Sequence, residues 1–266
     1  MSFEPVVPLS GLAGWTLLKR TEAAQSATFQ RRPDIARDEA YFREKIGSVT
    51  TAAQLVSDRR LLRVSLEAFG LEGDLRAGAF IRKVLEGGTD SGRALARRLA
   101  DPAYARFAAA FGFGNASGAK TATPGFADGI LRDWKARRFE AAIGTRDNTM
   151  RLALNARREL AIIAEGGGTE RTKWFKILGS KPLRAVVQGG LGLPPSIATL
   201  DIDRQVVELD RRITTVFGTG GVSQLRDSAK VETLIRRYLT LADTPARPGQ
   251  SAALSLLQSS RLNLRF

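Results

Sequence analysis

The sequence predicts an all-α protein. Three observations support this prediction: apolar residues recur at helical spacing, Gly and Pro residues separate the helical segments, and no segment alternates apolar and polar residues as a strand would. With 266 residues the chain can bury a sizeable core, and its length suits one large domain or two smaller ones. We therefore expect a helical bundle.

The clearest helical pattern lies in residues 57–86 and returns in altered form in residues 180–208. Each stretch begins with a Ser suited to cap a helix, followed by apolar residues at helical spacing and a Gly-Leu pair. These pairs, at residues 70–71 and 192–193, suit a helix end, because Gly adopts the left-handed conformation that this turn needs. Each stretch therefore predicts two helices joined by a tight turn.

The two stretches correspond beyond the turn, although one residue must be gapped before it. Two interpretations remain: an internal duplication with a period of about 120 residues, or one common helical hairpin that occurs twice. In either case we expect two related helical halves. With the Gly-Leu pairs aligned, the corresponding positions are Leu75 and Ile197, Arg82 and Arg204, Val84 and Val206, and Glu86 and Glu208.

The first half is predicted to span residues 1–120, with a helix over residues 11–30 near its start. The second part of this helix carries few large apolar residues, so we expect it to project into solvent or to bind a partner. Pro33 ends it, and Asp34 is placed to start the next helix. A later helix has an apolar face with the spacing i, i+3, i+4 and i+7, made of Tyr104, Phe107, Ala108 and Phe111.

A segment rich in Gly, Ser, Thr and Ala, residues 111–125, is the best candidate for the boundary between the halves. The second half is predicted over residues 121–244, and residues 245–266 follow as a linker and a helical tail. The most regular helix of the chain lies in this second half. Its apolar residues step by four and three positions and are expected to face the core: Ile202, Val206, Leu209, Ile213 and Val216.

The composition argues against an enzyme and for an anionic partner. Forty-one Lys and Arg residues against 27 Asp and Glu residues give a net charge of +14, which favours binding to an acidic protein or to nucleic acid. The chain has no Cys, which excludes disulfides, thiolate nucleophiles and Cys metal sites. It also has no His, the commonest general base and zinc ligand. We expect no catalytic residues, no cofactor and no metal.

The N-terminus and the hydropathy pattern indicate whether the sequence carries a cleaved signal peptide or a transmembrane segment. Residues 1–15 lack the basic start and the long apolar run of a cleaved signal peptide. No apolar run approaches the roughly 20 residues needed to cross a bilayer. We therefore expect neither a cleaved signal peptide nor a transmembrane segment.

Arg-Arg pairs are spread over nearly every predicted helix. The planar guanidinium group suits recognition of carboxylates and phosphates, so the pairs raise the question of a binding surface. Adjacent helical residues point about 100° apart, so one Arg of a pair can pack its stem while the other is solvated. Solvated helix faces, an acidic protein partner and nucleic acid all remain open. The seven pairs are residues 31–32, 59–60, 97–98, 137–138, 157–158, 211–212 and 236–237.

Two Gly-rich segments and one acidic pair are candidates for chemistry but suit helix ends better. Residues 165–173 and 217–225 follow predicted helices, whereas nucleotide-binding loops follow strands, so we interpret both segments as helix caps. Asp201 and Asp203 would diverge on a helix, and Asp201 is well placed as an N-cap. Phosphate binding by either segment, or metal binding or acid-base chemistry by the Asp pair, is the competing interpretation.

Long motifs carry a family resemblance. YFREKIGSVTTAAQLVSDRRLLRVSLEAFGLEGDLRAGAFIRKVLEGG is followed by ALARRLADPAYARFAAAFGFG, and later by KWFKILGSKPLRAVVQGGLGLPPSIATLDIDRQ and an RRYL run. Together they resemble a bacterial family of unknown biochemical function, many of whose members are described as flagellar proteins. The resemblance covers residues 10–240 and implies an association with the bacterial flagellum. It brings no catalytic or binding residues with it.

Resemblance and composition together predict a non-enzymatic structural or accessory protein of the bacterial flagellum, acting through basic helical surfaces and terminal helices. The alternative is a cytoplasmic regulator or assembly factor that binds an acidic protein or nucleic acid. We also expect the helix of residues 11–30 and the tail around Leu254 to mediate self-association. A chain without residues 1–30 and 250–266 would then fold as a monomer.

Overall fold

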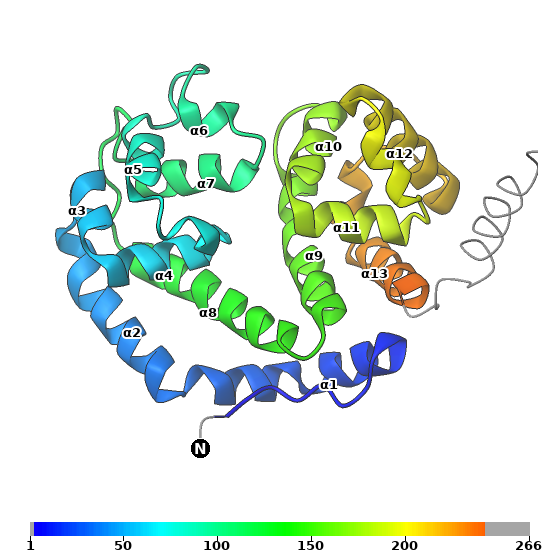
Figure 1. Ribbon diagram of the computed structural model, residues 1–266, viewed down its shortest axis with the longest axis horizontal. Helices are drawn as coiled ribbons and strands as arrows, with labels where there is room; N and C mark the ends of the chain where they lie inside the picture. Colours follow the sequence, from blue (N-terminus) through cyan, green and yellow to red (C-terminus); the bar gives the residue numbers. More distant parts are fainter. Residues whose placement is uncertain (1–2, 243–266) are drawn as a thin grey trace, which may run out of the picture.

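The computed structural model describes residues 3–242, and every regular element in that range is helical, which confirms the all-α prediction (Figure 1). Short 3-10 helices connect several of the α-helices. The first seven α-helices are α1 (Gly11–Gln30), α2 (Pro33–Lys45), α3 (Ala52–Ser57), α4 (Arg59–Phe69), α5 (Gly78–Glu86), α6 (Leu95–Arg98) and α7 (Pro102–Phe111). The others are α8 (Phe126–Gly144), α9 (Asn148–Glu165), α10 (Glu170–Gly179), α11 (Lys181–Gly190), α12 (Ile202–Phe217) and α13 (Ser228–Ala242).

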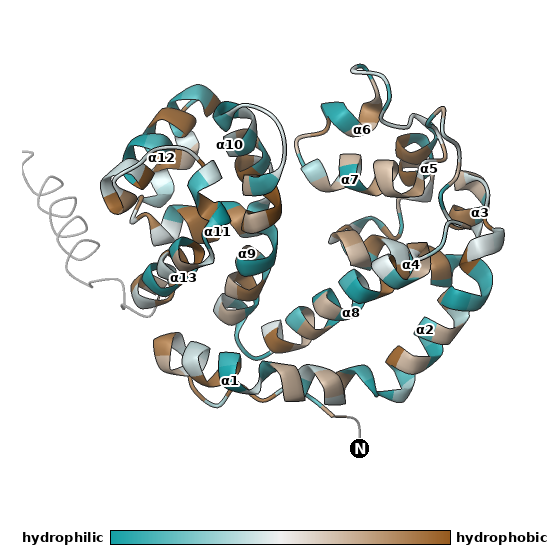
Figure 2. Cartoon of the chain, turned by 180° about the vertical axis from the view of Figure 1, so that it is seen from behind, coloured by the Kyte–Doolittle hydropathy of each residue, from teal (hydrophilic) through white to brown (hydrophobic). Residues whose placement is uncertain are grey.

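The helices form two groups that lie side by side. In Figure 1, the first group, α2 to α8, lies on one side and the second group, α9 to α13, on the other, while α1 runs along the lower edge of both. Helix α8 packs against α4 in the first group and against α9 in the second, and therefore joins them. Seen from behind, hydrophobic and hydrophilic residues alternate around the helices, as amphipathic packing requires (Figure 2).

The Gly-rich segment before α8 is fastened to the first group. The buried hydroxyl of Thr121 donates to the carbonyl oxygen of Val49 at 2.5 Å, and the Asn115 side chain accepts from the Thr89 backbone N–H at 2.6 Å. The segment is therefore a packed connection rather than an extended linker. The division of the chain into domains near residue 120 stays a prediction.

The three tryptophans mark how the core is built. Trp15, Trp134 and Trp174 each expose 1 % of their surface, and they belong to α1, α8 and α10. Each indole N–H donates to a carboxylate: Trp15 to Glu232 at 3.1 Å, Trp134 to Glu67 at 2.7 Å, and Trp174 to Asp210 at 3.0 Å. A buried indole N–H needs such a partner, so these bonds fix each large ring in one orientation.

Helix α1 belongs to the core, which contradicts the expectation that its second part is free. Phe29 is 2 % exposed and meets the ring of Phe139 edge-on, with 5.8 Å between ring centroids. Trp15 and Leu18 bury the first part of the same helix. Removing residues 1–30 would uncover these contacts, which argues against the expectation that a chain without residues 1–30 and 250–266 folds as a monomer. The Leu254 tail lies outside the described residues.

The Gly-Leu turns form as predicted in both stretches. Gly70 and Gly192 have left-handed φ values of +76° and +68°. In each turn the N–H of the following Leu donates to a carbonyl five residues earlier, Leu71 to Leu66 and Leu193 to Gln188, both at 2.9 Å. This bond is the signature of a Schellman motif, which satisfies a free carbonyl at the end of a helix.

The Ser residues at the start of the stretches do not cap helices. Ser57 is the last residue of α3, and the carboxylate of Asp58 caps α4 by accepting from the backbone N–H groups of Arg60 and Leu61. Ser180 holds the N-cap position of α11 without a side-chain capping bond. Asp58 rather than Ser57 caps α4, because its charged carboxylate accepts hydrogen bonds from two of the free N–H groups and suits the positive end of the helix.

Beyond the turns the two stretches diverge. The 3-10 helix that follows is Glu72–Asp74 in the first stretch and Pro195–Thr199 in the second, and α5 is shorter than α12. The predicted apolar face of α12 holds for Leu209 and Ile213, which are buried, whereas Ile202 is 53 % exposed. Ile202 misses the core because it is the first residue of the helix. An internal duplication stays a prediction.

Candidate functional site

Two of the seven Arg-Arg pairs enter the interior of the molecule. Both residues are partly buried in the pairs 137–138 on α8 and 157–158 on α9, whereas both are exposed in the pair 97–98 on α6. The remaining pairs follow the predicted pattern, with the first Arg exposed and the second partly buried: 31–32, 59–60, 211–212 and 236–237.

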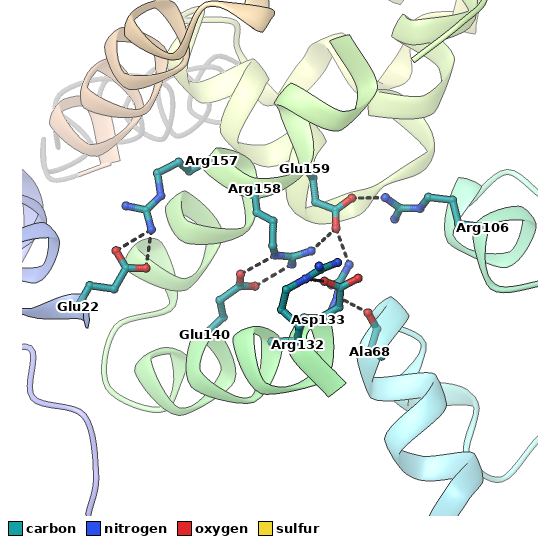
Figure 3. A network of polar contacts seen from close by, with 10 residues as sticks. Glu22, Ala68, Arg106, Arg132, Asp133, Glu140, Arg157, Arg158 and Glu159 are labelled. Carbon is teal, nitrogen blue, oxygen red and sulfur yellow. Dashed lines mark hydrogen bonds and ion pairs between the residues drawn. The ribbon is translucent and has the colours of Figure 1, made fainter. Parts of the chain in front are cut away.

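A buried carboxylate on α9 collects three guanidinium groups, and we call this set the Glu159 cluster (Figure 3). Glu159 is 3 % exposed and accepts from Arg106 of α7, from Arg158 of its own helix, and from Arg137 of α8 at 2.6 Å. Arg158 also makes two parallel bonds to Glu140 at 2.9 and 3.0 Å. Such forked pairs are the strongest ion pairs available to Arg.

The electrostatics of the Glu159 cluster keep its central carboxylate ionised. Burial raises the pKa of Glu159, but the positive charges of Arg106, Arg137 and Arg158 outweigh burial and hold that pKa below its ordinary value. Burial lowers the pKa of Arg137, and the neighbouring charge of Arg158 adds to this effect. The negative charge of Glu159 is therefore more than compensated by its three Arg partners.

The Glu159 cluster fastens the two helix groups to each other. Arg137 contacts Glu159 in the second group and also donates its Nε–H to the carbonyl oxygen of Ala68, at the end of α4, at 3.0 Å. Beside the cluster, Arg157 donates to Glu22 of α1 at 2.5 and 2.6 Å. Removing one partner of a buried pair of this kind costs about 3–5 kcal/mol, so the chemistry of this set is structural.

A groove of about 540 Å³ lies between the two groups, and we call it the inter-group groove. Helices α6 and α7 form one wall, and α9 and α10 form the other. Its lining is mostly apolar and includes Ile162, which is 49 % exposed, and the ring of Phe175. Arg97, Arg106 and Lys176 are the charged residues of the lining, which contains no carboxylate. An apolar surface that also carries cations is suited to binding.

The two Gly-rich segments are helix ends, as predicted, and they face each other. Thr169 caps α10 by accepting from the Thr172 N–H at 3.2 Å, and Gly218 ends α12 in a left-handed conformation. The carboxylate of Glu170 in the first segment accepts from the backbone of the second, at Val222 and at Ser223 (3.0 Å to the Ser223 nitrogen). The carboxylate of Glu170 already accepts the hydrogen bonds of the backbone N–H groups that a phosphate would need. This arrangement disfavours phosphate binding.

The Asp pair also serves structure. Asp201 caps α12 by accepting from the Arg204 N–H at 2.9 Å, as predicted, and Asp203 lies 2.6 Å from the guanidinium of Arg171. Within residues 3–242, no three side chains of the types His, Cys, Asp and Glu gather closely enough to hold a metal ion. In the same range, none of the helices combines the length and the apolar character that a bilayer crossing requires.

Sequence reasoning did not identify the Glu159 cluster, although the sequence contains a signal for it. Glu159 falls on an apolar face of its helix, three residues after Ala156 and four before Ile163. A carboxylate on such a face must be paired when it is buried, and the pairs 137–138 and 157–158 supply the partners. The inter-group groove has no comparable signal, because its walls come from segments far apart in the chain.

These features define a helical protein with a buried ionic link and a groove between two helix groups. Residues 68–231 match the model of a protein family of unknown function, DUF1217, and the chain belongs to this family. The crystal structure of a protein from Agrobacterium tumefaciens is similar, with 27 % sequence identity, a TM-score of 0.75, and coverage of 91 % of this chain and 99 % of that one. No curated protein matches the sequence.

Proposed function

We propose that this protein is a non-enzymatic structural or accessory protein of the bacterial flagellum that acts by binding other proteins. The resemblance of residues 10–240 to a family with many flagellar members supports the flagellar part of the proposal. The match to a family of unknown function is compatible with it and does not test it.

One observation carries the binding part of the proposal: the lining of the inter-group groove is mostly apolar and contains cations but no carboxylate. Lys176, a half-buried residue of this lining, makes no ion pair among the described residues, so its charge is available to a partner. By contrast, the buried charges of Glu159 and its three Arg partners are already paired. Contact with a protein surface is the activity that this distribution of charge favours.

A clean deletion of the gene tests the proposal. We expect reduced swimming and altered filaments or basal bodies, restored by a plasmid copy of the gene. The protein itself should be present in isolated basal bodies or in culture supernatant. Normal motility together with normal flagella in the deletion strain would refute the flagellar role.

A second candidate function is a cytoplasmic regulator or assembly factor that binds an acidic protein or nucleic acid. The net charge of +14 and the exposed pair Arg97-Arg98 favour it. Charge alone gives non-specific DNA binding with dissociation constants of roughly 10⁻⁴ to 10⁻⁶ M, so low-salt binding does not distinguish the functions. Sequence preference that survives physiological salt would support nucleic-acid binding and count against the first proposal.

A further inference from the structure

We propose that the inter-group groove binds an acidic amphipathic helix of a partner protein. The inference rests on the proposed function only in assuming that the protein acts by contact, and it does not depend on the flagellum. It follows from the shape of the groove, from its charge, and from what the chain itself can place there.

The walls of the groove suit a helix. Ala105 and Ala109 lie one turn apart on α7, and their short side chains leave room for a helix to approach closely. Ile162 and Phe175 face them from the other group and are only partly covered. The volume, about 540 Å³, lies in the range that holds several apolar side chains of a ligand. Residues 3–242 offer no strand edge, so strand addition does not apply.

The charge of the groove selects an acidic ligand. Lys176 makes no ion pair within the described residues, and Arg97 is bound to a backbone carbonyl oxygen, that of Thr89, at 3.0 Å. Arg106 bonds to Glu159 through one nitrogen, while its buried Nε has no hydrogen-bond partner. Carboxylates on the ligand would therefore meet Lys176 and Arg97, and the lining of the groove contains no like charge.

The chain itself supplies no suitable ligand. Residues 243–266 contain three Arg residues and a single acidic residue, Asp243, so their positive charge opposes binding beside Lys176 and Arg97. A second copy of the protein carries a net charge of +14 and is opposed for the same reason. Charge complementarity therefore points to a different protein that presents acidic residues along one edge of an apolar helix face.

A displayed library of helical peptides, each of roughly 20 residues, tests the proposal without knowledge of the natural partner. Positions around a fixed helix would be randomised to apolar, acidic, basic and neutral residues, and the full-length protein would be used for selection at physiological salt. We expect enriched peptides to combine apolar residues at i, i+3, i+4 and i+7 with flanking Asp or Glu. Failure to enrich any peptide, or enrichment of basic peptides, would overturn the proposal.

Two substitutions in the groove, each with a matched control, then locate the binding. Ile162→Asp is compared with Val207→Asp, because both residues are exposed and apolar but Val207 lies outside the groove lining. Lys176→Glu is compared with Lys83→Glu on α5, which is also outside it. Titration calorimetry with a selected peptide should show a loss of affinity of about tenfold or more for each groove variant and little change for its control.

The outcomes separate this proposal from the flagellar one. Equal affinity for the groove variants and their controls would overturn the groove assignment, whatever the deletion strain shows. Normal flagella in the deletion strain, with peptide binding lost in Ile162→Asp, would overturn the flagellar role and leave the groove assignment intact. Melting curves distinguish lost binding from lost folding, and Lys176→Glu provides an independent answer if Ile162→Asp unfolds.

Discussion

The two Gly-Leu turns have the same local structure and different surroundings. Gly70 and Gly192 share the left-handed conformation and the same backbone hydrogen bond to the preceding helix. At each turn an Arg from another helix also donates its Nε–H to a carbonyl at the helix end, Arg137 to Ala68 at 3.0 Å and Arg212 to Leu191 at 2.9 Å.

The two arginines differ in their other contacts. Arg137 continues into the Glu159 cluster, where it is 16 % exposed and bound to a buried carboxylate. Arg212 makes no ion pair within residues 3–242. Both Gly-Leu turns therefore end a helix, and the turn at Gly70 is in addition part of the link between the two helix groups.

The largest difference is expected when each Arg is removed. Arg137→Ala should lower the free energy of unfolding by about 3–5 kcal/mol, because it takes one partner from a buried charge network. Arg212→Ala should lower it by about 1 kcal/mol, the value of a single hydrogen bond to a carbonyl. Urea unfolding followed by circular dichroism measures both. Equal losses would show that the Glu159 cluster does not distinguish the turns.

Replacing each Gly by Ala should give a smaller difference in the same direction. A left-handed φ costs an Ala about 1–2 kcal/mol at either site. At Gly70 a Cβ would also lie 2.6 Å from Nη1 of Arg137, which is held by its own bonds, so the total should reach about 2–4 kcal/mol. At Gly192 the nearest atom, Nη2 of Arg212, is 3.5 Å away.

Thermal unfolding of the two Ala variants checks this prediction. Gly47→Ala is a suitable control, since a Cβ there meets no atom within 4 Å and its φ is not left-handed. A Gly192→Ala variant less stable than Gly70→Ala would contradict the assigned role of Arg137.

Acidic pH should weaken the Glu159 cluster, which Arg137 connects to the Gly70 turn. The lowered pKa of Glu159 contributes stability that is complete above about pH 4.3, its value in the unfolded chain, and is lost as pH falls through the folded pKa. Glu159→Gln should therefore show a smaller loss of unfolding free energy between pH 5 and pH 3 than the wild type, within roughly that window. Arg212→Ala should keep the wild-type slope, because Arg212 bonds to a carbonyl that does not titrate.

The smallest effects are expected at the aligned positions Arg82 and Arg204. Their ion pairs, with Glu86 at 2.6 Å and with Asp201 at 3.1 Å, join side chains that are at least half exposed. Either Arg→Ala substitution should change the unfolding free energy by less than about 0.5 kcal/mol. A larger loss at one position alone would indicate that the stretches differ at the surface as well as in the interior.

Local features of this protein could be predicted from its sequence, and contacts between distant segments could not. The Gly-Leu turns, the Asp201 cap and the Gly-rich helix ends depend on neighbouring residues, and all of them form as predicted. The second part of α1 and Ile202 were misplaced because burial depends on which other segments pack against them. Phe29 in α1 meets Phe139, more than a hundred residues later, whereas Ile202, the first residue of α12, stays 53 % exposed.

The three buried tryptophans give this fold its own spectroscopic reporters. Trp15 lies in α1, which runs along both groups, and Trp134 lies in the connecting helix α8. Trp174 lies in α10, next to Phe175 of the groove. With two of the three replaced by Phe, the fluorescence of the remaining indole would follow one region of the molecule alone. Intrinsic emission could then resolve whether the groups come apart before either of them melts.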